Sequence, residues 1–382
     1  MRFVALDLGA RKITCCEVVQ GGEVVGRSTV GKVQSLMRLL GPNTPPARVA
    51  FEACREGWHV AEQLARWGHE PVMVDTTRVK QLGIGQHQRK TDRIDAETLA
   101  RALAEGRLPV AHVLAPHRQA LRFQLSVRRT LVETRAAYVA QIRELVRAHG
   151  EELPGCTTEQ FGTRLRQAPL SEKVRALVTP LAALLEPLEQ QLALTEQKLL
   201  QLCDEEPAVS LLATACGVGV IVAAAFVSVI DTPQRFRRGG EVAAYLGLVP
   251  SERTSGKRRL GAITKQGNSY LRALLLEGAW TIVRRRHPDP LSLWAQAVAQ
   301  RRGSLVAAVA TARRLAVILW AMWRDGTVYD PKQLAVEGAR GLQQQATRQE
   351  VRAVALQRAA SKLSKRRRQA ERAAAPTTMM PR

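Results

Sequence analysis

The sequence predicts an α/β domain followed by two mainly helical regions, and three observations support this fold class. Up to about residue 110, short apolar strand-like runs alternate with helix-like patterns. From about residue 117 to 200, helical periodicity dominates. From residue 208 to about 330, helical patterns flank a basic, glycine-containing loop. Antiparallel strands followed by alternating strands and helices describe a mixed sheet that is covered by helices.

The expected elements of the first region follow one another closely. An apolar strand is expected at residues 3–9. Residues 13–20 and 23–30 flank Gly21-Gly22, a two-residue turn that favours a β-hairpin. The remaining expected elements are a strand at 48–53, a helix at 57–67, a strand at 71–75 and a helix that begins near Asp92.

Two long helices are expected in the second region. They cover residues 119–149 and 171–202, and a Gly/Pro/Thr stretch at 152–162 divides them. This pattern is typical of an antiparallel helical arm or a coiled-coil-like hairpin. The arginines of the first helix either follow a nucleic-acid backbone or form a solvated face: Arg122, Arg128, Arg129, Arg135, Arg143 and Arg147.

These patterns divide the chain into four regions. Residues 1–116 form the expected α/β catalytic domain, and residues 117–205 form the helical arm. Residues 206–335 form a third, mainly helical domain. Residues 336–382 are rich in Gln, Ala and Arg and are expected to be a disordered basic tail.

The charge of the chain indicates a polyanionic partner. The net charge is +23 and the sequence pI is about 10.8. Nucleic acid is the commonest partner of such a protein. A polybasic membrane binder is disfavoured because the charge is spread along the whole chain and no lipidation motif is present.

Cysteine usage and hydropathy indicate a reduced, cytoplasmic protein associated with the bacterial nucleoid. The six cysteines form no C-x-x-C pair and the seven histidines form no H-E-x-x-H motif, so neither a zinc site nor disulfides are indicated. No signal peptide precedes the first strand. The apolar run at 218–230 is too short to span a bilayer, and no membrane partner is expected.

Four carboxylates in the first hundred residues are candidate metal ligands. Asp7 interrupts an apolar strand, where a carboxylate costs free energy unless something compensates it. Glu52 ends a second strand, and Asp92 and Asp95 lie three residues apart at a helix start, so they face one side. Acids that converge in this way repel one another unless divalent cations neutralise them. Two such ions, about 3.5–4 Å apart, activate a nucleophile and stabilise a leaving oxygen at phosphorus.

Each acid also has an ordinary interpretation. Asp92 can cap its helix, Asp95 can favour the positive end of that helix, and Glu52 can be a solvated strand-end residue. The set of four, in this order and on these elements, favours the metal site.

Two motifs in the third region are candidate nucleic-acid contacts. Gly217 and Gly219 lie in a Cys-Gly-Val-Gly segment that resembles the turn of a helix-hairpin-helix. In such a turn, glycines let the protein backbone approach the DNA closely, and the N–H groups of the next helix bind a DNA phosphate. A plain helix-breaking turn fits this segment equally well. In the basic loop at 251–267, Ser255 is either a phosphate hydrogen-bond donor or a nucleophile. The cations of this loop are Lys257, Arg258, Arg259 and Lys265.

These residues together resemble a known family. Asp7, Glu52, Lys-Thr-Asp-Arg-Ile-Asp-Ala at 90–96, Tyr-Leu-Gly-Leu-Val-Pro at 245–250 and Ser255-Gly256 look like the corresponding motifs of the DEDD transposases. Those enzymes belong to insertion sequences related to the Piv DNA invertase. The resemblance covers residues 3 to about 285.

The resemblance implies an RNase H/RuvC-like first domain, a coiled-coil insertion and a transposase domain. Asp7, Glu52, Asp92 and Asp95 would bind Mg²⁺, as two ions that Mn²⁺ could replace, and Ser255 would form a covalent phosphoserine link to DNA. Lys90 belongs to the matched motif and would contact nucleic acid. The partners would be double-stranded DNA of the element ends and target, a noncoding bridge RNA, and further copies of the chain, from dimer to tetramer. In such an assembly, the tetrad of one subunit meets the serine of another.

The leading hypothesis is therefore a Mg²⁺-dependent DNA transposase that is guided by RNA. The main alternative is a RuvC-like, metal-dependent endonuclease of the Holliday-junction type, in which water attacks and Ser255 only contacts a phosphate. A third alternative is a non-catalytic RNA- or DNA-binding protein. The presence of all four acids argues against this last interpretation.

Overall fold

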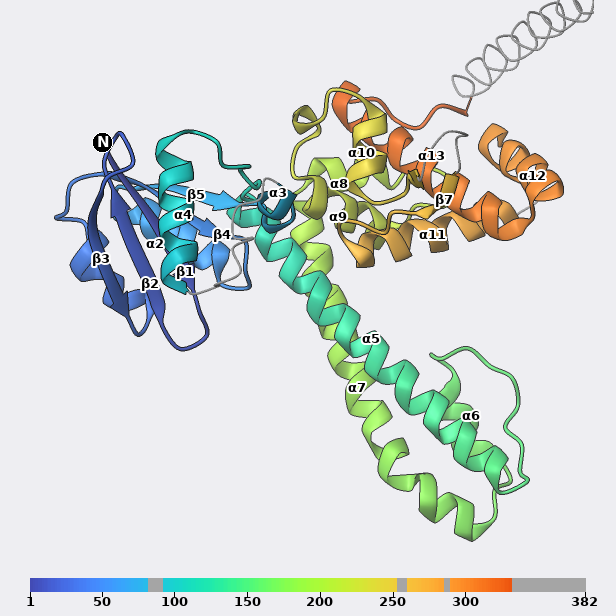
Figure 1. The fold of residues 1–382 in the computed structure, drawn as a ribbon. Coiled ribbons are helices and arrows are strands. Elements are labelled where there is room, and N and C mark those ends of the chain that lie inside the picture. The colour runs from blue at the N-terminus through green and yellow to red at the C-terminus, as the bar shows by residue number, and fades with distance from the viewer. Residues whose placement is uncertain (82–91, 253–259, 285–288, 332–382) are drawn as a thin grey trace, which may run out of the picture. The chain divides into compact units, whose positions relative to one another are not determined.

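The computed structural model describes residues 1–81, 92–252, 260–284 and 289–331 (Figure 1). The chain divides into two compact units, Met1–Pro116 and His117–Arg382. The basic tail at 336–382 lies outside the described residues.

The first unit is built on a five-stranded mixed sheet with the order β3-β2-β1-β4-β5 (Figure 1). The pairs β1/β2 and β2/β3 are antiparallel, whereas β1/β4 and β4/β5 are parallel. The mixed sheet predicted from the sequence is therefore confirmed. The strands are β1 (Arg2–Leu8), β2 (Ile13–Val18), β3 (Val24–Val30), β4 (Ala47–Glu52) and β5 (Glu70–Val74).

Helices cover both faces of this sheet because the strands alternate their apolar side chains between two cores. Leu6 and Phe51 pack on one face with the helix α2 (Gly57–Arg66). Ala5 and Ala50 pack on the other face with the helix α4 (Asp92–Ala104). Successive residues of a strand point to opposite faces, so the position of any strand residue assigns it to a face.

Three short helical segments of this unit were not predicted: the 3-10 helix η1 (Val33–Leu36) and the helices α1 (Met37–Leu40) and α3 (Thr76–Gln81). They escape a periodicity search because each is one or two turns long. The predicted hairpin turn is present, and both Gly21 and Gly22 have positive φ angles, of 108° and 82°.

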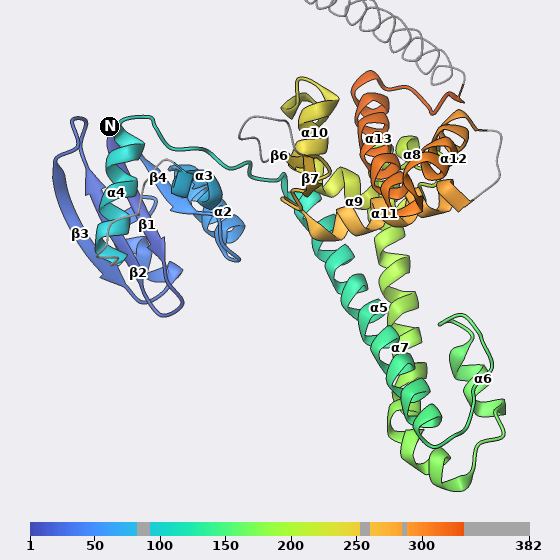
Figure 2. The same cartoon turned by 45° about the vertical axis from the view of Figure 1, so that its right-hand side comes forward.

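The second unit begins with a helical arm. The helices α5 (Pro116–Ala148) and α7 (Glu172–Asp204) lie side by side along the arm (Figures 1 and 2). On α7, the buried residues Val178, Leu185, Leu192 and Leu199 recur every seven positions, which is the spacing of a coiled-coil seam. The segment expected to be a loop between the two helices leads into a further helix, α6 (Phe161–Gln167), that packs at the tip.

Most of the arginines of α5 contact other side chains of the same unit, so they do not form a row of free cations for nucleic acid. Arg128 pairs with Glu196 of α7 at 2.6 Å. The Arg129 guanidinium lies 5.1 Å from the ring centre of Tyr270. Arg135 is buried and Arg143 lies 5.0 Å from the ring centre of Phe161. These side chains hold the arm together and join its root to the C-terminal helices.

The C-terminal helices share one core with the root of the arm, which contributes Leu121 and Leu199. At its centre, α9 is buried along residues 223–230. The helices are α8 (Pro207–Leu212), α9 (Val220–Ile230), α10 (Gly239–Tyr245), α11 (Ser269–Arg284), α12 (Pro290–Arg302) and α13 (Ser304–Asp325), with the 3-10 helix η2 (Pro233–Arg235) between α9 and α10. The loop predicted at 251–267 carries two unpredicted short strands, β6 (Pro250–Glu252) and β7 (Leu260–Ile263), which form an antiparallel ribbon.

Among the described residues, α13 is the one helix that is long and apolar enough to cross a membrane, by length and composition alone. Leu315 and Leu319 of α13 are fully buried and belong to the core described above. The helix is therefore a core helix of this unit. The apolar run considered in the sequence, at 218–230, belongs to α9 and not to this helix.

Candidate functional site

Two of the four candidate acids end adjacent parallel strands. β1 and β4 pair in parallel up to Leu6 opposite Phe51, so Asp7 and Glu52 follow at the same level of the sheet. By strand alternation, Asp7 lies on the face of Ala5 and Glu52 lies on the face of Ala50. Both acids therefore belong to the face that α4 covers.

The other two acids are in the first turn of α4. Ala96, Leu99 and Leu103 of this helix are buried against the sheet. Asp92 lies four residues before Ala96, and Asp95 lies four residues before Leu99, so both acids are near the sheet-facing side of the helix. The packing that buries α4 thus brings its acidic start to the face that carries Asp7 and Glu52.

A lysine that the sequence analysis did not consider lies among these acids. The Lys12 ammonium contacts Asp92 Oδ2 at 2.8 Å. Lys12 is in the turn between β1 and β2, directly before the strand whose Thr14 pairs with Asp7. The pKa of Lys12 is raised, chiefly by the hydrogen bond and charge of Asp92 and more weakly by the charge of Asp7. The sequence signal was a basic residue five positions after Asp7.

The donor chemistry of the four acids fits a hard divalent cation, since carboxylate oxygens are the ligands that Mg²⁺ and Mn²⁺ take. In this structure, however, the four carboxylates do not stand close enough together to share one ion. Within the described ranges, no three His, Cys, Asp or Glu side chains stand close enough to hold one ion. The structure thus places all four acids on one face of the sheet and joins Asp92 to a lysine.

The second candidate centre is the basic loop of the C-terminal unit. Ser255, Lys257, Arg258 and Arg259 lie outside the described residues, as does Lys90 of the first unit. The ends of the loop are described. Glu252 of β6 pairs with Leu260 of β7, and Pro250 pairs with Ile263.

The Tyr-Leu-Gly-Leu-Val-Pro segment forms the frame beneath this ribbon. Gly247 has a positive φ of 66°, and its carbonyl accepts a hydrogen bond from the Lys265 amide at 3.2 Å. Arg272 donates to the carbonyls of Leu246 and Gln266, at 3.1 and 2.7 Å. The exposed Lys265 is therefore fixed at the base of the ribbon by its own backbone.

The Gly-Val-Gly turn lies between α8 and α9, as the sequence predicted. Gly217 has a φ of 74°, and a Cβ atom there would lie 2.7 Å from Ile282 Cγ1 and 2.8 Å from the Gly278 carbonyl oxygen. Gly219 is exposed, and a Cβ atom there would have no neighbour within 4 Å. Gly217 is required by close packing on α11, whereas Gly219 faces open space before the first turn of α9.

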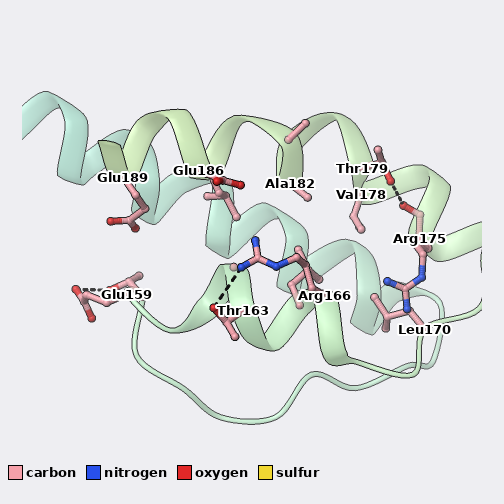
Figure 3. Close-up of a pocket in the computed structure, with 15 residues that line it drawn as sticks. Glu159, Thr163, Arg166, Leu170, Arg175, Val178, Thr179, Ala182, Glu186 and Glu189 are labelled. Carbon is pink, nitrogen blue, oxygen red and sulfur yellow. Dashed lines mark hydrogen bonds between the residues drawn. The ribbon is translucent and has the colours of Figure 1, made fainter. Parts of the chain in front are cut away.

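A cavity of about 560 Å³ lies at the tip of the arm, between α6 and α7 (Figure 3). Its wall includes Arg166, Arg175 and Glu186. Arg166 donates to Thr163 and Arg175 donates to the Ala168 carbonyl. None of the candidate site residues lines this cavity, so it is separate from both centres.

Two models of known protein families match this chain, one over the four acids and one over the Gly-Val-Gly turn and the basic loop. Residues 4–150, which include all four acids, match the model of a DEDD transposase domain of the IS110 type. Residues 209–295, which include Gly217, Gly219 and Ser255, match the "Transposase IS116/IS110/IS902 family".

Whole-length relatives are also transposases. The chain is 32% identical over 337 residues to a "Probable family 20 transposase" of Pseudomonas aeruginosa, an alignment that covers 86% of this chain and 98% of the relative. It is 28% identical to the transposase of IS1328 from Yersinia enterocolitica, over 86% of this chain and 98% of that one. It is 26% identical to the transposase of IS1111A from Coxiella burnetii, over 84% and 89%.

The fold and the matched sequences define an enzyme that acts on DNA. The chain belongs to the IS110/IS116/IS902 family of insertion-sequence transposases. Divalent metal use is usual for its DEDD-type domain.

Proposed function

We propose that this transposase cuts and rejoins DNA through a covalent phosphoserine intermediate, with the first unit acting as an RNase H/RuvC-like metal-dependent domain. The observation that carries the proposal is the placement of the four acids on one face of the sheet. Two end adjacent parallel strands, two start the helix that covers the same face, and all four lie in the matched DEDD domain.

The acids Asp7, Glu52, Asp92 and Asp95 are the proposed ligands of Mg²⁺, as two ions that Mn²⁺ can replace. Bound there, the ions would neutralise charge at the scissile phosphate and stabilise the negative charge that develops on the leaving oxygen. The role of the protein is to hold carboxylates at fixed strand ends and on one helix face. The two strands that carry Asp7 and Glu52 lie inside the sheet and are packed by a buried core on each face, which supports a fixed position for their ends.

Ser255 is the proposed nucleophile. Its Oγ would form a bond to phosphorus while the bond from phosphorus to the leaving sugar oxygen breaks. The serine proton would pass to a carboxylate, and its return to the leaving sugar oxygen would release that oxygen as a hydroxyl. The reverse attack by a sugar hydroxyl restores the serine, so the bond energy is conserved for rejoining. Lys90, Lys257, Arg258, Arg259 and Lys265 would bind phosphates, and Gly217 and Gly219 would shape a phosphate-binding turn.

The proposed partners are double-stranded DNA, a noncoding guide RNA and further copies of the chain. The net charge of +23 supports a polyanionic partner of either kind. The guide RNA and an assembly from dimer to tetramer rest on the resemblance of the motifs to Piv-related enzymes.

Asp7→Asn tests the metal-dependent first unit. The change keeps the shape of the side chain but removes a charged ligand, so strand cleavage of element-end DNA in Mg²⁺ should fall by at least about a hundredfold. Cleavage is measured on end-labelled DNA with the native flanking sequence supplied.

Asp75→Asn is the matched control. Asp75 follows β5, and its Oδ1 accepts a hydrogen bond from the Arg78 amide at 3.2 Å at the start of α3. An asparagine oxygen preserves that bond, so cleavage should stay near wild type. Wild-type cleavage by Asp7→Asn would contradict the proposed tetrad.

A further inference from the structure

Lys12 is a cation at the face of the sheet that carries the proposed metal ligands. Its ammonium contacts Asp92 Oδ2 at 2.8 Å, and the charge of Asp7 also acts on it. Asp92, one of the four acids, therefore already has a positive partner that the chain supplies.

The turn that carries Lys12 is closely packed. Gly9 donates to the Asp7 carbonyl at 3.2 Å, and a Cβ atom at Gly9 would lie 2.8 Å from the Lys12 carbonyl oxygen. The Asp7 end of β1 and the backbone of Lys12 are thus joined by one tight turn. The turn therefore fixes the position of the Lys12 backbone relative to the end of β1.

We infer that Lys12 is a positioning residue that holds Asp92 at the β1–β2 turn in the metal-free enzyme and competes with a divalent cation for Asp92. This inference rests on the proposed metal-binding role of the four acids. It also accounts for the spacing of the acids: one of them is directed to a lysine rather than into a shared coordination sphere.

The Lys12–Asp92 ion pair is weak enough for a divalent cation to replace the ammonium at Asp92. The side chains of Lys12 and Asp92 are 58% and 50% exposed, and an ion pair with that exposure contributes little stability. A divalent cation with several carboxylate ligands therefore displaces the ammonium, which remains nearby as a like charge. Removing a unit charge about 5–7 Å from the ion should tighten binding by about three- to tenfold at low salt, and by less at high salt.

The test is the binding of Mn²⁺ to the full-length protein, measured from the electron paramagnetic resonance signal of the free ion. Lys12→Met is expected to bind Mn²⁺ about three- to tenfold more tightly than wild type. Lys12→Arg keeps the charge and should bind like wild type. Lys32→Met removes another exposed lysine of the same unit and should also bind like wild type. Lys12 is exposed, so these changes should leave the fold intact.

The outcomes separate this inference from the proposed function. If wild type binds Mn²⁺, Asp92→Asn weakens binding and Lys12→Met binds like wild type, the role of Lys12 is overturned and the tetrad stands. If wild type binds no Mn²⁺, both are overturned. Tighter binding by Lys12→Met and Lys32→Met alike would show a general charge effect and would also overturn the role of Lys12.

Discussion

At the scale of single residues, several charged side chains in the described part of the chain stabilise local structure. Arg135 is the clearest case, with a side chain only 8% exposed. Its guanidinium donates to both carboxylate oxygens of Glu189 at 3.1 Å and to Glu159 at 2.9 Å. One buried arginine thus joins α5, α7 and the loop before α6.

Replacing Arg135 by Met should loosen the tip of the arm. Both acids are partly exposed and can be rehydrated, so the expected cost is about 1–2 kcal/mol. It should appear as faster amide hydrogen exchange at residues 161–167. Arg147→Met, an exposed site on the same helix, is the control and should leave that exchange unchanged. Equal exchange in both variants would show that Arg135 does not stabilise the tip.

Glu17 gives a pH dependence whose direction can be stated. The hydrogen bond from Arg2, with Nε 2.7 Å from Oε1, lowers the pKa of Glu17, and the charge of Arg2 adds to the effect. A carboxyl with a lowered folded-state pKa adds stability above its unfolded pKa of about 4.3 and loses it as pH falls through the folded value.

Glu17→Gln should therefore be less stable than wild type at pH 7, by less than about 1 kcal/mol after solvent screening. The difference should shrink as the pH falls below about 4. Chemical unfolding at several pH values measures it. A difference that does not change with pH would contradict this role of the pair.

At the scale of elements, close packing determines where the chain needs glycine. Gly217→Ala should destabilise the second unit by about 2–4 kcal/mol, because a methyl group would overlap Ile282 and the Gly278 carbonyl at a positive φ. Gly219→Ala has free space and an ordinary φ of −94°, so it should be nearly neutral. Thermal unfolding compares the two variants, and equal melting temperatures would contradict this account of the turn.

Elements with long or strict patterns could be predicted from the sequence. The strand ending at Glu52, the Gly21-Gly22 hairpin and the two arm helices all have apolar repeats or turn residues that specify them. The helices α1, α3 and α6 are too short to show a period. The ribbon of β6 and β7 was missed because its strands pair across the basic loop, Glu252 with Leu260 and Pro250 with Ile263, and no local pattern records such pairs.

The candidate site was predictable only in part for the same reason. The order of the acids identified the residues, and strand alternation placed them on one face. The Lys12–Asp92 contact depends on how α4 packs against the β1–β2 turn, so it appears only in three dimensions.

At the scale of the whole molecule, the chain combines two compact units. One family model covers the first unit and the first arm helix, residues 4–150, and the other covers residues 209–295, after the arm. The acids belong to the first unit and Ser255 belongs to the second. Phosphoserine chemistry requires both to meet one phosphate. Under the proposed mechanism, the two units must therefore come together at the DNA, within one chain or between chains.

The most direct test of the phosphoserine chemistry is recovery of DNA that is covalently attached to the protein. Wild type, Ser255→Ala and Asp7→Asn are expressed with the native flanking DNA, and adducts are mapped by mass spectrometry. The account predicts an adduct on Ser255 in wild type and in neither variant. Cleaved DNA without an adduct, or cleavage that survives Ser255→Ala, would contradict the account and indicate hydrolysis by a RuvC-like endonuclease mechanism.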